Sequence, residues 1–402
     1  MSRVKSWVLT DVANDIWLDS FGVANDVVRL PTPHSWSIRK RTLRGGLRDG
    51  VDLVEIHNGA LSLSLLPTRG MGIWRGDYRG QFLGWHAPVK GPVHPQFVDL
   101  DMRQGLGWLT GFDELLCRCG LASNGPPGED VRTDSQGRTH STPLTLHGRI
   151  ANQPAHYVEA QVSLDPPHEI KLVGQVAEGG LFFPHLHLTT TFTTIPGSNR
   201  IVVHDLVENR GGQQAEMQML YHLNLGPPLL EPGSRLVAPF REMSPLTARA
   251  AEDILTYETF GSPTAGFAEQ VYAYAPVGDS SGRTLALLSS AGGDRGLVLR
   301  WNQNELPCFT LWRNTAAIED GYVTGLEPGT NYPNPKAFER KQNRVRVLAP
   351  GGRWECAWSL EVLDAKPAVS KALAEIAELQ AHAPAKVHRT PHPTFSAAAH
   401  TI

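Results

Sequence analysis

The chain has 402 residues, of which 41% are hydrophobic and 19% are charged, a globular composition far from that of disordered chains. Its 37 Lys and Arg residues against 40 Asp and Glu residues leave a net charge of -3, so it lacks the basic field that holds a nucleic acid. No apolar run is long enough for a transmembrane helix, and the mixed N-terminus does not resemble a signal peptide. We therefore expect a cytoplasmic protein with neither a membrane nor a nucleic-acid partner.

Turn-forming residues and alternating apolar residues together predict an all-β fold. The 39 Gly and 30 Pro residues supply many turns, which short strands require. Leu61, Leu63 and Leu65 alternate with two serines, as in a half-buried strand. We predict a large antiparallel β-sandwich. In chain order, its clearest strands are 61–65, 170–176, 186–192, 200–207, 216–223, 284–288, 297–301, 309–312, 345–348 and 354–363.

Helical periodicity is scarce. Residues 113–119 are expected to form a turn or two of helix, and 366–380 an amphipathic helix that begins near Pro367. Residues 381–402 are rich in Ala, Pro, His and Thr, so we expect a disordered tail. The stretches 86–96 and 122–143 are expected to be long loops that build a pocket. This organisation predicts one β domain over 1–365, followed by a helix and tail over 366–402.

The segment 217–228 carries several polar side chains on one predicted strand. Gln218, Leu220, His222 and Asn224 should share one face, because side chains alternate along a strand. Three of the four can form hydrogen bonds, which is typical of a binding or catalytic surface. The alternative is a solvent-facing strand with an ordinary hydrogen-bonded histidine.

A carboxylate and several basic residues stand in other motifs. Glu327 lies between an apolar stretch and a Pro-Gly turn, where partial desolvation would raise its pKa and suit it as a base. The alternative is a carboxylate that caps a turn. His147 and Arg149 are expected to alternate on one face of a strand, and Arg69 precedes two glycines. Taken singly, either arginine is more typical of a surface or ion-paired residue.

Together these segments resemble the galactose mutarotase-like (aldose 1-epimerase) superfamily, and most closely a bacterial branch of it known as a domain of unknown function. The similar elements appear in order from about residue 50 to residue 363. They are Arg69-Gly70-Met71, Cys119-Gly120-Leu121, Leu146-His147-Gly148-Arg149-Ile150, Tyr221-His222-Leu223-Asn224-Leu225-Gly226 and Gly325-Leu326-Glu327-Pro328-Gly329.

The resemblance implies a β-supersandwich with no metal and no organic cofactor. It implies that His222 is a general acid and Glu327 a general base, facing each other across an open groove so as to bracket a pyranose ring. It makes His147 the second pocket histidine. Other sugar contacts are expected from Arg69, Arg149, Asn224 and the stacking candidates Trp85, Trp108 and Trp312. The usual Asp ahead of the base has no clear match, and Glu269 is the best substitute.

These residues predict an enzyme that interconverts the anomers of a small sugar or sugar derivative, acting as a monomer or homodimer. A base takes the proton of the C1 hydroxyl while an acid protonates the ring oxygen, and the open aldehyde then rotates and recloses. Two alternatives use the same groove: a non-catalytic sugar-binding protein, and an isomerase or lyase for an oxidised sugar.

A metal-dependent, cupin-like enzyme is a further alternative. His185 and His187 would share one face of a strand, as two metal ligands do. Thr189, Thr190 and Thr191 stand where a carboxylate ligand would be expected, which disfavours a metal site. The four cysteines, at positions 117, 119, 308 and 356, also lack the paired spacing of a zinc site and are too few for a disulfide scaffold.

Overall fold

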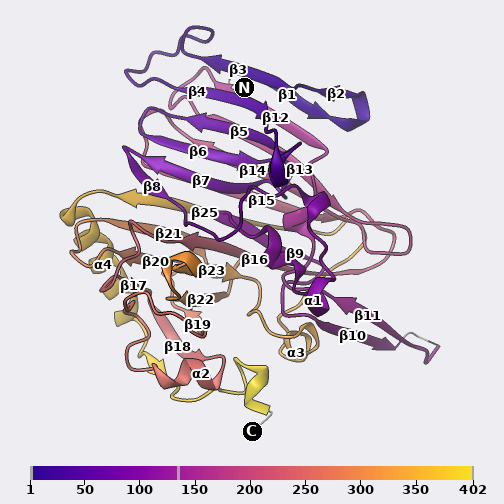
Figure 1. Cartoon of the computed structure of the whole chain (residues 1–402), viewed down its shortest axis with the longest axis vertical. Helices are drawn as coiled ribbons and strands as arrows, with labels where there is room; N and C mark the ends of the chain where they lie inside the picture. Colours follow the sequence, from indigo (N-terminus) through magenta and orange to yellow (C-terminus); the bar gives the residue numbers. More distant parts are fainter. Residues whose placement is uncertain (1–2, 134–135, 401–402) are drawn as a thin grey trace.

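The predicted strands assemble into two large sheets that lie against each other (Figure 1). The computed structural model describes residues 3–133 and 136–400. Nine of the ten predicted segments lie within strands of the structure, and the tenth, 345–348, begins one residue before its strand. Neighbouring strands pair antiparallel, apart from one short pair at a sheet edge that is described below. The expected all-β supersandwich is confirmed.

The first sheet contains ten strands. In spatial order they are β17 (Arg235–Val237), β20 (Arg283–Ser289), β21 (Gly296–Asn302), β25 (Arg353–Leu363), β15 (Arg200–Asn209), β14 (Leu186–Thr194), β13 (Ile170–Glu178), β12 (Tyr157–Ser163), β1 (Val4–Asp11) and β2 (Ile16–Trp17). Along β13 and β14 buried and half-buried residues alternate, because only one face of the sheet meets the core.

The second sheet contains fourteen strands. Along its main path these are β26 (Lys386–Val387), β18 (Phe240–Pro245), β19 (Gln270–Pro276), β22 (Cys308–Asn314), β23 (Val323–Gly329), β16 (Ala215–Leu225), β9 (Leu116–Leu121), β7 (Gly72–Tyr78), β6 (Leu61–Leu66), β5 (Asp52–His57), β4 (Ser37–Thr42) and β3 (Ser20–Ala24). Two further strands pair beside this path, β24 (Arg346–Leu348) with β16 and β8 (Gln81–Leu83) with β7. The central strands β9, β16 and β23 are buried on both faces, unlike β13 and β14.

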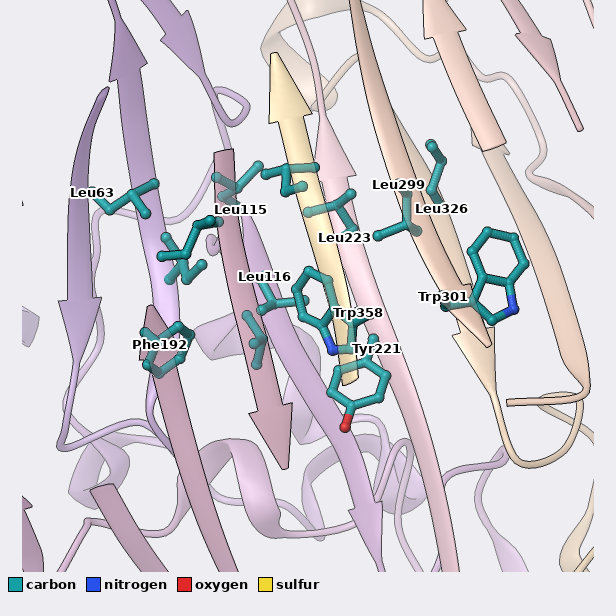
Figure 2. Packing of buried hydrophobic residues seen from close by; sticks show 14 of the residues in the cluster. Leu63, Leu115, Leu116, Phe192, Tyr221, Leu223, Leu299, Trp301, Leu326 and Trp358 are labelled. Carbon is teal, nitrogen blue, oxygen red and sulfur yellow. The ribbon is translucent and has the colours of Figure 1, made fainter. Parts of the chain in front are cut away.

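One apolar core lies between the two sheets and contains residues of both. Figure 2 shows Tyr221 of β16 beside Trp358 of β25, with ring centroids 5.3 Å apart. The Tyr221 hydroxyl donates a hydrogen bond to Asp205 over 2.8 Å, and Asp205 forms a bidentate ion pair with Arg118 of β9. Both charged side chains are 0% exposed. Because the sheets share this core, we propose that the chain forms one domain up to residue 365.

Two expectations for the middle of the chain are corrected. Residues 113–119 were expected to form a turn or two of helix, but those from Leu116 onward belong to strand β9, in which Leu116 and Arg118 face the core while Cys117 and Cys119 face the other side. The expected loop 122–143 contains a separate hairpin of β10 (Gly128–Thr133) and β11 (Thr139–Leu144). Residues 134–135 of that loop lie outside the described part.

The helices are few, as expected, and the C-terminal one is confirmed. They are α1 (Met102–Gly105), α2 (Ala248–Glu252), α3 (Lys336–Lys341) and α4 (Lys366–Ala381). Helix α4 has Pro367 in its first turn and packs Val369, Ile376 and Leu379 against β20 and β21. None of the helices in the described residues has the length and apolar character needed to cross a membrane.

The tail that follows α4 packs on the second sheet, contrary to the expected disorder. Strand β26 pairs in parallel with β18, at the sheet edge (Figure 1). Phe395 is buried against Tyr332, and the Ser396 hydroxyl donates to the carbonyl of Leu246 over 2.6 Å. The tail has no periodic pattern that would predict its order from sequence, because the contacts that hold it come from the second sheet. Residues 401–402 of the expected tail lie outside the described part.

Candidate active site

His222 and Glu327 lie side by side on neighbouring strands. Strands β16 and β23 pair with Asn224 opposite Gly325 and Leu223 opposite Leu326, a register that places His222 opposite Glu327. His222 Nε2 and Glu327 Oε1 are 3.2 Å apart, and the two side chains are 5% and 2% exposed. Glu327 lies inside β23, not at a strand end. The face they share points away from the core between the sheets.

Asn224 fixes the tautomer of His222. The Asn224 amide nitrogen donates to the carbonyls of Glu114 and His222, both over 3.0 Å, so its oxygen must act as an acceptor. His222 Nδ1 lies 2.6 Å from that oxygen and therefore carries the hydrogen. Nε2, the other ring nitrogen, faces Glu327 with a free lone pair. Asn224 thus acts through His222, whereas a direct sugar contact was expected.

Burial decides which of the two groups is protonated. Burial, helped by the charge of His147, lowers the pKa of His222 to about 3, although the hydrogen bond with Asn224 acts in the opposite direction. Burial also raises the pKa of Glu327 well above its usual range. Both shifts favour a neutral pair, with the proton on Glu327. This distribution is the reverse of the acid and base roles implied by the family resemblance.

Glu327 also has a buried oxygen without a hydrogen bond. Although Oε1 lies 3.2 Å from His222 Nε2, the alignment does not satisfy hydrogen-bond geometry, and the atom has no other partner in the described residues. Buried polar atoms are nearly always satisfied, and those that are not are concentrated where function requires them. The unsatisfied oxygen is therefore available to a ligand hydroxyl.

Aromatic rings surround this pair. His147 lies with its ring centroid 5.4 Å from that of His222, and Trp108 is 4.7 Å from His147. Phe112 and Trp312 contact His222 at 5.2 and 5.3 Å. The expected stacking residue Trp85 packs on Phe112 at 5.0 Å, one layer further out. These rings belong to a second apolar cluster that is separate from the core.

His147 reaches the cluster from a turn, so the expected strand alternation with Arg149 is wrong. His147 has a left-handed φ of 58° and Gly148 one of 71°, which reverses the chain. Gly148 is required there, because an added Cβ would approach the Ser123 carbonyl to 2.2 Å. Arg149 is exposed, and its charge acts on Glu178. Its contact with sugar stays a prediction.

Glu269 and Trp312 form the rim of the cluster. The half-buried Trp312 donates its indole hydrogen to the exposed Glu269 over 2.6 Å. Glu269 also acts electrostatically on Glu327, raising its pKa further. Glu269, the best substitute for the usual Asp of the family, therefore lies close to the His222–Glu327 pair, at its solvent-exposed edge.

Arg69 does not face the cluster, which corrects its expected role as a direct sugar ligand. It is buried and ion-paired with Glu114, Nε to Oε1, over 2.5 Å. It also donates to the Gly111 carbonyl over 2.9 Å, to the Val93 carbonyl and to Asn152. Arg69 therefore secures the backbone beside Phe112 and acts on the cluster only indirectly.

Gly325 is a site residue that sequence reasoning missed. A Cβ at position 325 would lie 2.5 Å from Glu327 Oε1 and 3.0 Å from His222 Cε1. The His222–Glu327 pair thus has room only because glycine, which has no side chain, stands at position 325. Cys117 and Cys119 were also missed, although two cysteines two residues apart on a strand must share a face.

Gly325→Ala is expected to lower turnover by up to about 100-fold, because small displacements of reacting groups have effects of that size. The added Cβ meets the end of the Glu327 side chain and the edge of the His222 ring but no backbone atom, so the melting temperature should change little. Turnover and thermal unfolding measured together test this. Gly22→Ala is the matched control, because a Cβ there meets no atom within 4 Å. Unchanged turnover in Gly325→Ala would show that the pair tolerates displacement.

The expected pair of metal ligands is not brought together. His185 Nε2 lies 3.0 Å from the Gly180 carbonyl, while His187 packs against His156 with ring centroids 5.9 Å apart. Across residues 3–133 and 136–400, no three His, Cys, Asp or Glu side chains are arranged to hold a metal ion. The geometry therefore offers the cupin-like alternative no support.

Comparisons with known proteins agree on the fold. Residues 48–362 match the family model of a domain of unknown function, DUF4432. A crystal structure of a candidate aldose 1-epimerase from Klebsiella pneumoniae is 36% identical, covers 97% of this chain and 99% of its own, and has a TM-score of 0.90. No curated protein matches the chain significantly.

More distant solved structures share the fold alone. A galactose mutarotase-like protein from Clostridium acetobutylicum is 15% identical, with a TM-score of 0.55 over 81% of this chain and 98% of that chain. A candidate aldose 1-epimerase from Escherichia coli K12 is also 15% identical, with a TM-score of 0.51 over 78% and 99%. The chain therefore belongs to the DUF4432 family and has the galactose mutarotase-like fold.

Proposed function

We propose that the protein is an aldose 1-epimerase-like enzyme that interconverts the anomers of a small sugar by acid–base catalysis at Glu327 and His222. The observation that carries this proposal is the pair itself. A buried carboxyl with an unsatisfied oxygen lies 3.2 Å from an imidazole nitrogen with a free lone pair.

The side-by-side arrangement suits the two oxygens that must exchange protons. The ring oxygen and the C1 hydroxyl of a pyranose are both bonded to C1, so the groups that serve them must also be neighbours. A pair on adjacent strands can meet both oxygens from one side of the sugar. This differs from the expected pair that brackets the ring, because no ring fits between atoms 3.2 Å apart.

The resting protonation state defines the first step. Glu327 gives its proton to the ring oxygen while His222 Nε2 accepts the proton of the C1 hydroxyl, and the C1–ring oxygen bond breaks. The result is an open aldehyde with Glu327 ionised and His222 protonated. After the aldehyde rotates, the reversed transfers reclose the ring on its other face and restore the neutral pair.

The aromatic rings supply the sugar-binding surface. Trp108, Phe112 and Trp312 surround His222, and an aromatic face packs well against the C–H face of a pyranose. Closure by these rings also keeps water away from the pair, which strengthens its electrostatic interactions. Apart from the breaking and re-forming of the bond between C1 and the ring oxygen, the proposed steps are proton transfers, and they involve neither a metal nor an organic cofactor.

NMR exchange spectroscopy across a panel of aldoses tests the proposal. We expect at least one sugar to show faster exchange between its anomers when the protein is added, without added metal. Sugar binding with no faster exchange of any aldose would favour the non-catalytic sugar-binding alternative. Turnover that is lost on chelation and restored by one divalent ion would contradict the metal-free mechanism.

A further inference from the structure

The short loop 122–125, which follows β9, holds His147 through two backbone carbonyls. The amide of His147 donates to the Gly125 carbonyl over 3.0 Å, and its ring nitrogen Nδ1 lies 2.9 Å from the Asn124 carbonyl. A carbonyl can only accept, so Nδ1 carries a hydrogen. Nε2 is then the ring nitrogen that remains for a ligand, and its direction depends on where this loop lies.

A reciprocal pair of side-chain amides ties this loop to the segment that follows Glu327. The Asn124 amide nitrogen donates to the Asn331 oxygen over 2.9 Å, and the Asn331 amide nitrogen donates to the Asn124 oxygen over 2.8 Å. Asn124 is 0% exposed and Asn331 is 1% exposed. Asn331 lies just beyond the end of β23. The amide pair therefore connects the loop that holds His147 with the strand that carries the proposed acid.

Neighbouring groups fix the orientation of the amide pair. The Asn331 amide nitrogen also donates to the Tyr332 carbonyl over 2.7 Å, so this end of the amide must be the nitrogen. The Thr330 hydroxyl donates to the Asn331 oxygen over 3.0 Å. Both hydrogens and both acceptor positions of the Asn331 amide are thereby used. The side chain therefore acts through Asn124 and not by direct contact with a ligand.

The segment after β23 also contacts the loop through other groups. Lys336 Nζ donates to the Ala122 carbonyl over 2.6 Å. A Cβ added at Gly125 would lie 2.1 Å from the Asn334 carbonyl oxygen, so the two backbones are in direct contact there. These contacts bring the two segments together. The hydrogen bonds of the amide pair are directional, so they fix where the loop lies along the segment.

We propose that Asn331 is a positioning residue that acts through Asn124 to hold the His147 ring, with Nε2 directed towards a sugar bound at the proposed acid–base pair. The ring centroids of His147 and His222 are 5.4 Å apart. A shift of the loop therefore changes how one bound sugar meets both histidines. The contact between His147 and a sugar rests on the proposed function, whereas the placement of Nδ1 does not.

The first test is NMR spectroscopy of the full chain labelled with 15N-histidine. In the unmodified protein we expect the Nδ1 hydrogen of His147 to be visible, because its hydrogen bond with the Asn124 carbonyl protects it from exchange with water. In Asn331→Ala its exchange should become at least about tenfold faster, since the loop loses both bonds of the amide pair. Asn331→Asp, which keeps the shape of the side chain but cannot donate, should act in the same direction.

Asn58→Ala is the matched control. Asn58 is another fully buried asparagine, in the turn between β5 and β6, and its amide nitrogen donates to Thr194 Oγ1 over 2.7 Å. Its replacement should lower stability but leave the exchange of the His147 hydrogen unchanged. Equal exchange in Asn331→Ala and the unmodified protein would overturn the proposal. A His147 without a hydrogen on Nδ1 in the unmodified protein would also overturn it, even if the variants do not fold.

A double-mutant cycle tests whether the two amides act as one unit. Asn124→Ala, Asn331→Ala and the double variant are compared by the exchange rate of the same hydrogen. The double variant should resemble either single variant, because the second replacement removes no further bond of the pair. Additive effects would show that Asn331 acts on His147 by another route, and would contradict the proposal.

Turnover links this placement to the proposed function. On an aldose that the protein converts, Asn331→Ala should lower turnover by up to about 100-fold, the effect of displacing a reacting group by about 1 Å. Asn58→Ala should not lower it. Faster exchange with unchanged turnover would overturn the positioning role. A protein that converts no aldose but shows the expected exchange rates would refute the proposed function alone.

Discussion

Glu327→Gln is expected to lower the anomer-exchange rate by about 100- to 10,000-fold, the range that general acid–base groups contribute. The amide keeps the shape of the side chain but cannot give a proton to the ring oxygen or take one back. Sugar affinity should change little, because the loss concerns an interaction made in the transition state. Exchange rates and sugar affinity measured on whichever aldose is active check this expectation.

Glu269→Gln provides the matched control at the rim. Glu269 is exposed and accepts a hydrogen bond from Trp312, so its replacement should change affinity more than turnover. Near-normal turnover in Glu327→Gln would mean that the carboxyl has a structural role. The chain would then be better described as a sugar-binding protein that kept the groove.

Asp205→Asn should destabilise the fold by about 3–5 kcal/mol, the usual effect of removing one partner from a buried ion pair. Asp205 accepts hydrogen bonds from Arg118 over 2.5 and 2.9 Å and from the Tyr221 hydroxyl over 2.8 Å. Both charged side chains are fully buried, so the variant leaves a guanidinium without a counter-charge. Urea unfolding monitored by circular dichroism measures the difference.

An exposed ion pair provides the comparison. Arg41 and Glu55 lie 3.6 Å apart on exposed side chains, so Glu55→Gln should cost at most about 1 kcal/mol. The double variant Arg118→Met/Asp205→Leu should recover much of the lost stability, because it removes both charges together. A loss below about 1 kcal/mol in Asp205→Asn would show that water or a rearranged side chain replaces the carboxylate.

The fold was predictable wherever one face of a strand meets the core. Strands β13 and β14 show this clearly, since alternation is simple when one side is buried. The same rule failed for β9, which is buried on both faces and therefore reads as a continuous apolar run with one arginine. It also failed for the C-terminal tail, whose order depends on partners in β18 and near Tyr332.

The site was predictable to the extent that the family resemblance names its residues. His222, Glu327 and His147 are brought together, and Glu269 lies at the rim of the cluster next to Trp312. The protonation state could not be read from sequence, because it depends on burial and on the orientation of Asn224. The role of Arg69 depends on Glu114, a partner far away in the chain that no local pattern reveals.

The strands that carry the site meet in an order unrelated to their order in the chain. Strand β16 lies between β9 and β23, so Cys117, His222 and Glu327 become neighbours only after two long loops have closed. Such non-local pairing is entropically demanding and makes folding slow. A fragment that ends before β23 lacks the carboxyl group, and one that begins after β9 lacks the strand that pairs beside His222. In a refolding experiment, recovered turnover would therefore report that the whole sheet has assembled. The circular-dichroism signal of β-strands would not, because a partly formed sheet also produces it.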